Sequence, residues 1–275
     1  MEIEYLETMP DPALRPWVDH YWSFRTTGEE EELTPEQCCI QLGKPEFMAH
    51  LYGKPSKGLL HGKWVTFPQA YFTGISLGPM MWHMQGSACM VGVCLKPEGA
   101  LHLLGLPLAA ICDGYGDARD HMLPLTWKRV QPALARHDPG EALSGLEKLL
   151  LEVLERIPEP NDRFITALRR IREQGVRWDK QALYECLFVG DRQMQRLFKE
   201  RLGLSPRAYF KIMRFQEAYN ATRDHKQVDW MGLVTLLGYS DQPHLIRDFK
   251  RFAGSSPQGF MQQPLPRFQR PALAR

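Results

Sequence analysis

Short apolar runs separated by turn-forming residues dominate the chain up to about residue 125. Runs bounded by glycine and proline are typical of strands in an antiparallel sheet or barrel. They predict strands at residues 17–25, 38–42, 47–52, 65–75, 80–85 and 88–95. Pro97 then begins a predicted short helix that runs towards Leu104 and ends at Gly105, because proline favours a first helical turn and glycine a helix end.

Apolar residues take a helical spacing in the next segment. Between residues 139 and 157 they recur three and four positions apart, with glutamate and lysine between them, which predicts an amphipathic helix. Such a helix either packs on its own domain or mediates a dimer or inter-domain contact. The sequence PEPND at residues 158–162 then interrupts the pattern and marks a domain boundary.

The remainder of the chain is predicted to be almost entirely helical. The expected helices are one from about Phe164 to Gly175, then 180–187, 191–202, 207–223, 229–237 and 241–253. Ser205-Pro206 is a strong helix start, since serine caps the first turn and proline fits its first position. The helix at 207–223 is apolar on more than one side, which indicates burial between two neighbours.

These patterns predict an α+β protein with an N-terminal β-rich domain, a barrel or sheet with helices, ahead of an all-α domain. We expect a β-rich domain at 1–125, a helical linker with a candidate dimerisation helix at 126–160, the helical domain at 161–263 and a proline-rich tail at 264–275.

The helical domain contains an internal repeat with an offset of 51 residues. RLFKERLGLSP at Arg196–Pro206 aligns with RDFKRFAGSSP at Arg247–Pro257, and Arg, Phe, Lys, Gly, Ser and Pro recur in register. Each copy combines a short helix, a tight turn and a longer basic helix, which is the pattern of a helix-turn-helix. Two copies are too few for a solenoid.

The second helix of each unit must bury one face and expose the other. The outer faces carry Arg192, Gln195, Arg196 and Lys199 in the first copy and Gln242, His244, Arg247 and Lys250 in the second. Arginine can donate two hydrogen bonds to guanine, and glutamine can pair with adenine. These faces therefore carry the side chains that direct readout of DNA requires, although both residue types are also common on solvated helices.

Charge is distributed unevenly within a net charge of +2. Residues 161–275 carry 21 Lys/Arg against 11 Asp/Glu, whereas residues 1–160 carry 13 against 21. This asymmetry suggests a polyanion partner for the second half alone, or chance clustering on solvated faces.

Targeting and redox signals favour a cytoplasmic protein. The sequence has neither an apolar run of 18 residues nor a basic and apolar leader, so we expect no membrane span and no secretion. Six cysteines in a large chain that lacks a signal peptide predict reduced thiols, and the absence of a C-x-x-C spacing indicates neither a zinc knuckle nor a thioredoxin-type motif.

The repeat resembles the DNA-binding domain of the AraC/XylS transcription regulators. The match is carried by GYSDQPHLIRDFKRFAGSSPQGF at Gly238–Phe260, with support from RLFKERLGLSPRAYF at Arg196–Phe210. The resemblance implies two helix-turn-helix units joined by one long helix, whose recognition helices enter successive major grooves about 34 Å apart. It also implies double-stranded DNA and RNA polymerase as partners.

The resemblance assigns roles to individual residues. Arg192, Gln195 and Arg196 would contact bases from the first unit, and Gln242, His244 and Arg247 from the second, whereas Lys199 and Lys250 would contact phosphates. Two positions depart from the family pattern. Gly190 replaces a helix-capping serine, so the first recognition helix is expected to begin less firmly, and Pro243 replaces a small polar residue.

The N-terminal region is similar to that of one branch of these regulators. The similarity rests on PALRPWVDHYWSF at Pro12–Phe24 and KPEGALHLLGLP at Lys96–Pro107, and it implies a sensor or dimerisation role. Trp22, Phe24 and Trp82 are candidates to line a pocket for a small-molecule effector, or they belong to an aromatic core. His50, His61, His83 and His102 show no metal-ligand spacing, so neither a metal nor a cofactor is expected.

Two alternatives to ligand-dependent regulation stay open. A fusion with DNA-repair alkyl transfer would need an activated thiolate, but the sequence lacks a Pro-Cys-His-Arg motif and the common hydrolase and nucleotide motifs, so no enzyme is expected. A regulator whose first half binds a protein partner and no ligand is the other alternative.

Overall fold

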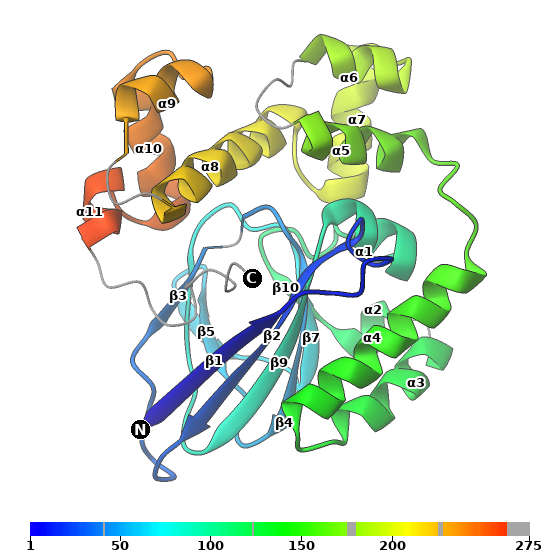
Figure 1. Ribbon diagram of the computed structural model, residues 1–275, viewed down its shortest axis with the longest axis vertical. Helices are drawn as coiled ribbons and strands as arrows, with labels where there is room; N and C mark the ends of the chain where they lie inside the picture. Colours follow the sequence, from blue (N-terminus) through cyan, green and yellow to red (C-terminus); the bar gives the residue numbers. More distant parts are fainter. Residues whose placement is uncertain (41, 123, 175–179, 225–227, 263–275) are drawn as a thin grey trace.

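The computed structural model describes residues 1–262 except residues 41, 123, 175–179 and 225–227. The predicted helix end at Gly175 and the predicted tail at 264–275 lie outside the described residues. Figure 1 shows two layers of β-structure below, with a row of helices above them and further helices along one side. Among the described residues, every helix is too short or too polar to cross a lipid bilayer.

The first part of the chain forms two antiparallel sheets. The larger has the order β1-β2-β9-β4-β7-β10 and the smaller has the order β3-β8-β5-β6. Their bounds are β1 Glu2–Thr8, β2 Val18–Thr27, β3 Gln37–Cys39, β4 Glu46–Tyr52, β5 Lys57–Leu60, β6 Lys63–Thr66, β7 Ala70–Thr73, β8 Met80–His83, β9 Ala88–Leu95 and β10 Tyr115–Asp117. In the described residues the two sheets do not close into a barrel, so of the two predicted forms the sheet is the correct one.

The larger sheet is covered on both faces. Trp22 and Phe24 of β2 pack between the two sheets, whereas Val18 and Tyr21 join a second core that continues into the helices. All eight residues of β9 are buried, as a central strand with two covered faces requires. Gly92 makes room for its cross-strand partner Trp22, because a methyl group at Gly92 would overlap the indole ring.

Helices flank the sheets. The predicted helix after Pro97 is α1, Pro97–Leu104, and Gly105 ends it with a φ of 57°. It is followed by α2 Ala118–His121, α3 Pro124–Leu134 and α4 Pro139–Arg156. Asp138 caps α4 by accepting a hydrogen bond of 2.9 Å from the Glu141 N–H. The amphipathic α4 packs against α3 and β9 of its own domain, and its role in dimerisation stays a prediction.

The second part of the chain is helical, as predicted. Its helices are α5 Arg163–Gln174, α6 Lys180–Leu187, α7 Asp191–Leu202, α8 Pro206–Asp224, α9 Trp230–Leu236, α10 Gln242–Ala253 and α11 Pro257–Gln262. Figure 1 shows α8 as a rod with α5, α6 and α7 gathered at one end and α9, α10 and α11 at the other.

One predicted strand is wrong and three strands were not predicted. The predicted strand at 65–75 is two strands, because the chain leaves the smaller sheet after β6 and enters the larger sheet as β7. Pro68, which has no N–H for a sheet ladder, lies at this crossing. The strands without a prediction are β1, β5 and β10.

Candidate DNA-binding surface

The internal repeat is a structural repeat. Helices α7 and α10 occupy positions related by the 51-residue offset, and each ends at a glycine with positive φ, 76° at Gly203 and 74° at Gly254. Ser205 and Ser256 then cap the next helices by accepting from the N–H groups of Ala208 and Gly259. Because α6 precedes α7 and α9 precedes α10 across short turns, each copy is a helix-turn-helix unit.

The rod α8 links the two units through aromatic contacts. The ring of Phe198 on α7 meets Tyr209 at the start of α8 with centroids 5.7 Å apart. Further along the same rod, Phe215 meets Phe249 of α10 edge-on at 5.1 Å. All four side chains are buried, so the two units share one core through α8. This confirms the prediction that the apolar helix lies between two neighbours.

Both recognition helices expose the faces that the sequence predicted. Met194, Phe198, Leu245 and Phe249 point inward and are at most 1% exposed. Seven of the eight predicted DNA-contact residues are exposed, and they are Arg192, Gln195, Arg196, Lys199, Gln242, Arg247 and Lys250. The eighth, His244, is half-buried, with its ring against Tyr239 at 5.2 Å. Their contacts with DNA stay predictions.

Several of these side chains make local contacts. Arg196 donates to the Gln193 side chain at 3.0 Å, and Arg247 donates to the Pro243 carbonyl at 3.3 Å. Lys199 donates to the Gly203 carbonyl at 2.9 Å, which satisfies an acceptor at the end of α7. Each of these bonds is on the surface, where exchange for a phosphate or a base costs little.

The two recognition helices begin differently. Asp241 caps α10 by accepting from the His244 N–H at 2.7 Å, and Pro243 lies in the first turn, where its missing N–H is tolerated. Gly190 occupies the equivalent position before α7 and offers no side-chain cap. That α7 begins less firmly than α10 stays a prediction.

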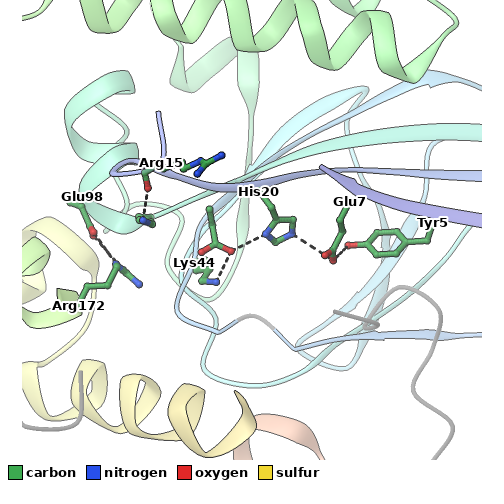
Figure 2. A network of polar contacts seen from close by, with 9 residues as sticks. Tyr5, Glu7, Arg15, His20, Lys44, Glu98 and Arg172 are labelled. Atoms are coloured by element: carbon green, nitrogen blue, oxygen red, sulfur yellow. Dashed lines mark hydrogen bonds and ion pairs between the residues drawn. The ribbon is translucent and has the colours of Figure 1, made fainter. Parts of the chain in front are cut away.

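The β-rich domain supports the helix-turn-helix domain at the ends of both recognition helices. A methyl group at Gly203 would lie 2.4 Å from Cys112 Cβ, and one at Gly254 would lie 3.5 Å from Pro79 Cγ. A third contact joins Arg172 of α5 to Glu98 of α1 through bonds of 2.8 and 3.3 Å. Figure 2 shows this ion pair at the junction of the two parts.

The three predicted ligand residues lie together between the sheets. Trp22, Phe24 and Trp82 are at most 3% exposed, and Phe24 meets Trp82 edge-on at 4.9 Å. The indole N–H of Trp22 donates to Glu46 at 3.1 Å, and burial raises the pKa of this carboxyl. They form a packed aromatic cluster, and their role in ligand binding stays a prediction.

Sequence reasoning missed a polar network at the edge of this cluster. Asp19 pairs with Lys44 at 2.7 Å and with the His20 ring at 2.8 Å, and His20 reaches towards Glu7, which Tyr5 contacts (Figure 2). Burial alone would raise the pKa of Asp19, but Lys44 and His20 lower it below its usual value. Asp19, His20 and Cys94 offer metal donors, but the Lys44 ammonium already balances the Asp19 carboxylate.

Two family models match separate parts of the chain. Residues 183–263 match a helix-turn-helix domain, and residues 6–117 match a domain of unknown function, DUF6597. Together with the repeated units, the first match defines a helix-turn-helix DNA-binding protein. More specifically, its C-terminal domain is of the AraC type, and the chain is a DNA-binding transcription regulator. No curated protein matches the chain.

Several solved structures align with most of this chain. ToxT from Vibrio cholerae aligns over 94% of this chain and 97% of its own, with 6% identity and a TM-score of 0.45. Wild-type ToxT from the same organism with a bound unsaturated fatty acid aligns over 94% of each chain, with 10% identity and a TM-score of 0.44. The AraC-like transcriptional activator CuxR aligns over 79% of this chain and 95% of its own, with 13% identity and a TM-score of 0.28.

Proposed function

We propose that this regulator reads a specific DNA sequence by placing α7 and α10 in successive major grooves on one side of a duplex. The observation that carries the proposal is the exposure of equivalent basic faces on two helices that are fixed to one rod. The 19 residues of α8 span about 28 Å at the rise of an α-helix, which is comparable to one turn of DNA, about 34 Å.

The exposed residues divide into two kinds of contact. Arg192, Gln195 and Arg196, with Gln242, His244 and Arg247, are assigned to bases. Lys199 and Lys250 lie one turn further along each helix and are assigned to phosphates, which position a protein without reading sequence. Because His244 is half-buried, its side chain extends less far towards a bound duplex than the side chains of its exposed neighbours.

The β-rich domain is proposed to regulate this binding by taking a small-molecule effector. Its contacts with Gly203 and Gly254 provide a physical connection to both recognition helices. The alternative of alkyl transfer is disfavoured by the thiols. Burial raises the pKa of the thiol at five positions, which are Cys38, Cys39, Cys89, Cys94 and Cys112, whereas a nucleophilic cysteine needs a lowered pKa.

The test compares base-reading and phosphate-binding variants on a site selected from genomic DNA. Arg196→Ala should lose about 1–3 kcal/mol of binding free energy on the preferred site and little on a site changed at one base pair. Lys199→Ala should weaken binding to all sequences alike and reduce the salt slope by about one unit. Lys148→Ala, which removes an exposed charge on α4, is the control. Equal losses for Arg196→Ala on every sequence would contradict the assignment to bases.

A further inference from the structure

The β-rich domain has a cavity of about 250 Å³, and two of its lining residues, Gly78 and Pro79, lie close to Arg251 and Gly254 at the end of α10. It is bounded by the β5–β6 turn, the loop between β7 and β8, and residues 113–114. Leu60, Leu77 and Met80 supply apolar groups. The polar side chains of the lining are His61, Ser76 and Asp113. At about 30 Å³ per water molecule, the cavity has the volume of about eight waters, which suits a molecule of one or two rings.

The cavity holds the carboxylate of Asp113, one oxygen of which has no partner among the described residues. Asp113 Oδ1 accepts from the Leu77 N–H at 2.9 Å and lies 3.4 Å from Ser76 Oγ. Among the described residues, the other oxygen, Oδ2, has no hydrogen bond or ion pair, and the cavity lining includes neither lysine nor arginine. A carboxylate in a lining that is partly polar and partly apolar favours a small ligand that carries a positive charge next to an apolar group.

The loops that bound the cavity are the ones that support both recognition helices. Pro79, in one wall, faces Gly254 at the end of α10. Cys112, which precedes the lining residue Asp113 in the chain, faces Gly203 at the end of α7. The two loops are joined to each other, because the Asp113 N–H donates to the Ile75 carbonyl at 3.0 Å. A molecule that moves this pair of loops therefore acts on both repeat units at equivalent points.

We propose that this cavity is the effector site, and that it binds a small organic amine whose ammonium group pairs with Asp113. Occupancy changes how the two loops hold Gly203 and Gly254, and so changes the relative placement of α7 and α10. Binding of the amine at this cavity does not depend on the proposed function, whereas its effect on DNA binding rests on that function.

The first experiment measures binding without DNA. Benzylamine, phenethylamine and tryptamine are titrated into the full chain by calorimetry, beside the same rings carrying a carboxylate in place of the amine. At least one amine should bind, and Asp113→Asn should weaken it tenfold or more. Asparagine keeps the acceptor for Leu77 and tolerates the φ of 56° at this position, so the loop is preserved. Asp120→Asn removes an exposed acid on the adjacent α2 and should change nothing.

The second experiment measures DNA affinity with and without the saturating amine. The affinity of the wild-type chain should change at least fivefold, the lower end of typical allosteric couplings, and that of Asp113→Asn should not change at the same concentration. The site is overturned if no amine binds at millimolar concentration, if binding survives Asp113→Asn, or if the carboxylates bind better. An effect on DNA that is absent while the amine still binds overturns the effector role. Failure of the chain to bind any DNA overturns the proposed function and leaves the first experiment valid.

Discussion

Replacing Arg172 by methionine should loosen the junction between the two parts of the chain. Glu98 is 1% exposed and Arg172 is 16% exposed, and the two are joined by two hydrogen bonds. Burial alone would lower the pKa of Arg172, but the Glu98 carboxylate raises it above its usual value. Without the guanidinium, Glu98 is a buried charge with no hydrogen bond or ion pair from a described side chain. Breaking a buried pair in this way typically costs about 3–5 kcal/mol.

The assay is native-state hydrogen exchange of the α1 and α5 amides, because a chain with two parts need not unfold in one step. The double variant Glu98→Gln with Arg172→Met should recover most of the loss, since it leaves no buried charge. Arg136→Met is the control, because its bond to Glu141 is also 2.8 Å long but both side chains are more than half exposed. It should change the opening free energy by at most about 1 kcal/mol. Equal effects of Arg172→Met and Arg136→Met, or no recovery in the double variant, would refute the reasoning.

Three further predictions concern capping, docking and pH. Gly190→Asp should raise the free energy of unfolding in urea by about 0.5–1 kcal/mol. The aspartate supplies the missing side-chain cap of α7 at a position with no neighbouring atoms to clash with, and it lowers the conformational entropy of the unfolded chain. No gain would mean that α7 needs no cap. Gly203→Ala and Gly254→Ala both place alanine in a left-handed conformation, which costs about 1–2 kcal/mol of folding stability. Only the methyl group of Gly203→Ala also collides with Cys112, so this variant should lose clearly more stability in thermal unfolding. Equal losses would argue against tight docking of the two domains at Gly203. Burial lowers the pKa of His50 to about 4, below the unfolded value of about 6.5, so stability present above pH 6.5 should fall by about 3 kcal/mol as the pH drops to 4. The measurement is the urea midpoint as a function of pH. His50→Gln should reduce its fall between pH 6.5 and 4, and an unchanged fall would exclude His50 as the cause.

Helices were predicted better than strands for identifiable reasons. The helices combine long periodic patterns with caps, and α6 and α7 begin and end at the predicted residues. In β1, Ile3 and Tyr5 face inward, but Glu7 continues that face and Leu6 on the other face is 54% exposed, so the apolar residues do not keep a strict alternation. The β5–β6 hairpin turns through two residues with positive φ, His61 and Gly62, and histidine is an uncommon residue there.

The site was predicted in part. Helical periodicity is a local property, so it identified seven of the eight outward residues of α7 and α10 correctly, whereas His244 is half-buried. The support of Gly203 and Gly254 by the β-rich domain joins residues far apart in the sequence, and a single chain offers no pattern for such contacts. The division of the chain at residues 126 and 160 stays a prediction. One hydrophobic core runs from Val91 of β9 to Phe249 of α10 and gives no sharp boundary.

The continuity of α8 has a consequence for the genome. Because α8 has a fixed length, the proposed function requires a fixed spacing between the two halves of an operator. Inserting about five base pairs between the halves rotates one of them by half a turn, to the opposite side of the duplex. One helix-turn-helix unit could then no longer reach its half of the operator, whereas an insertion outside both halves should leave the affinity unchanged.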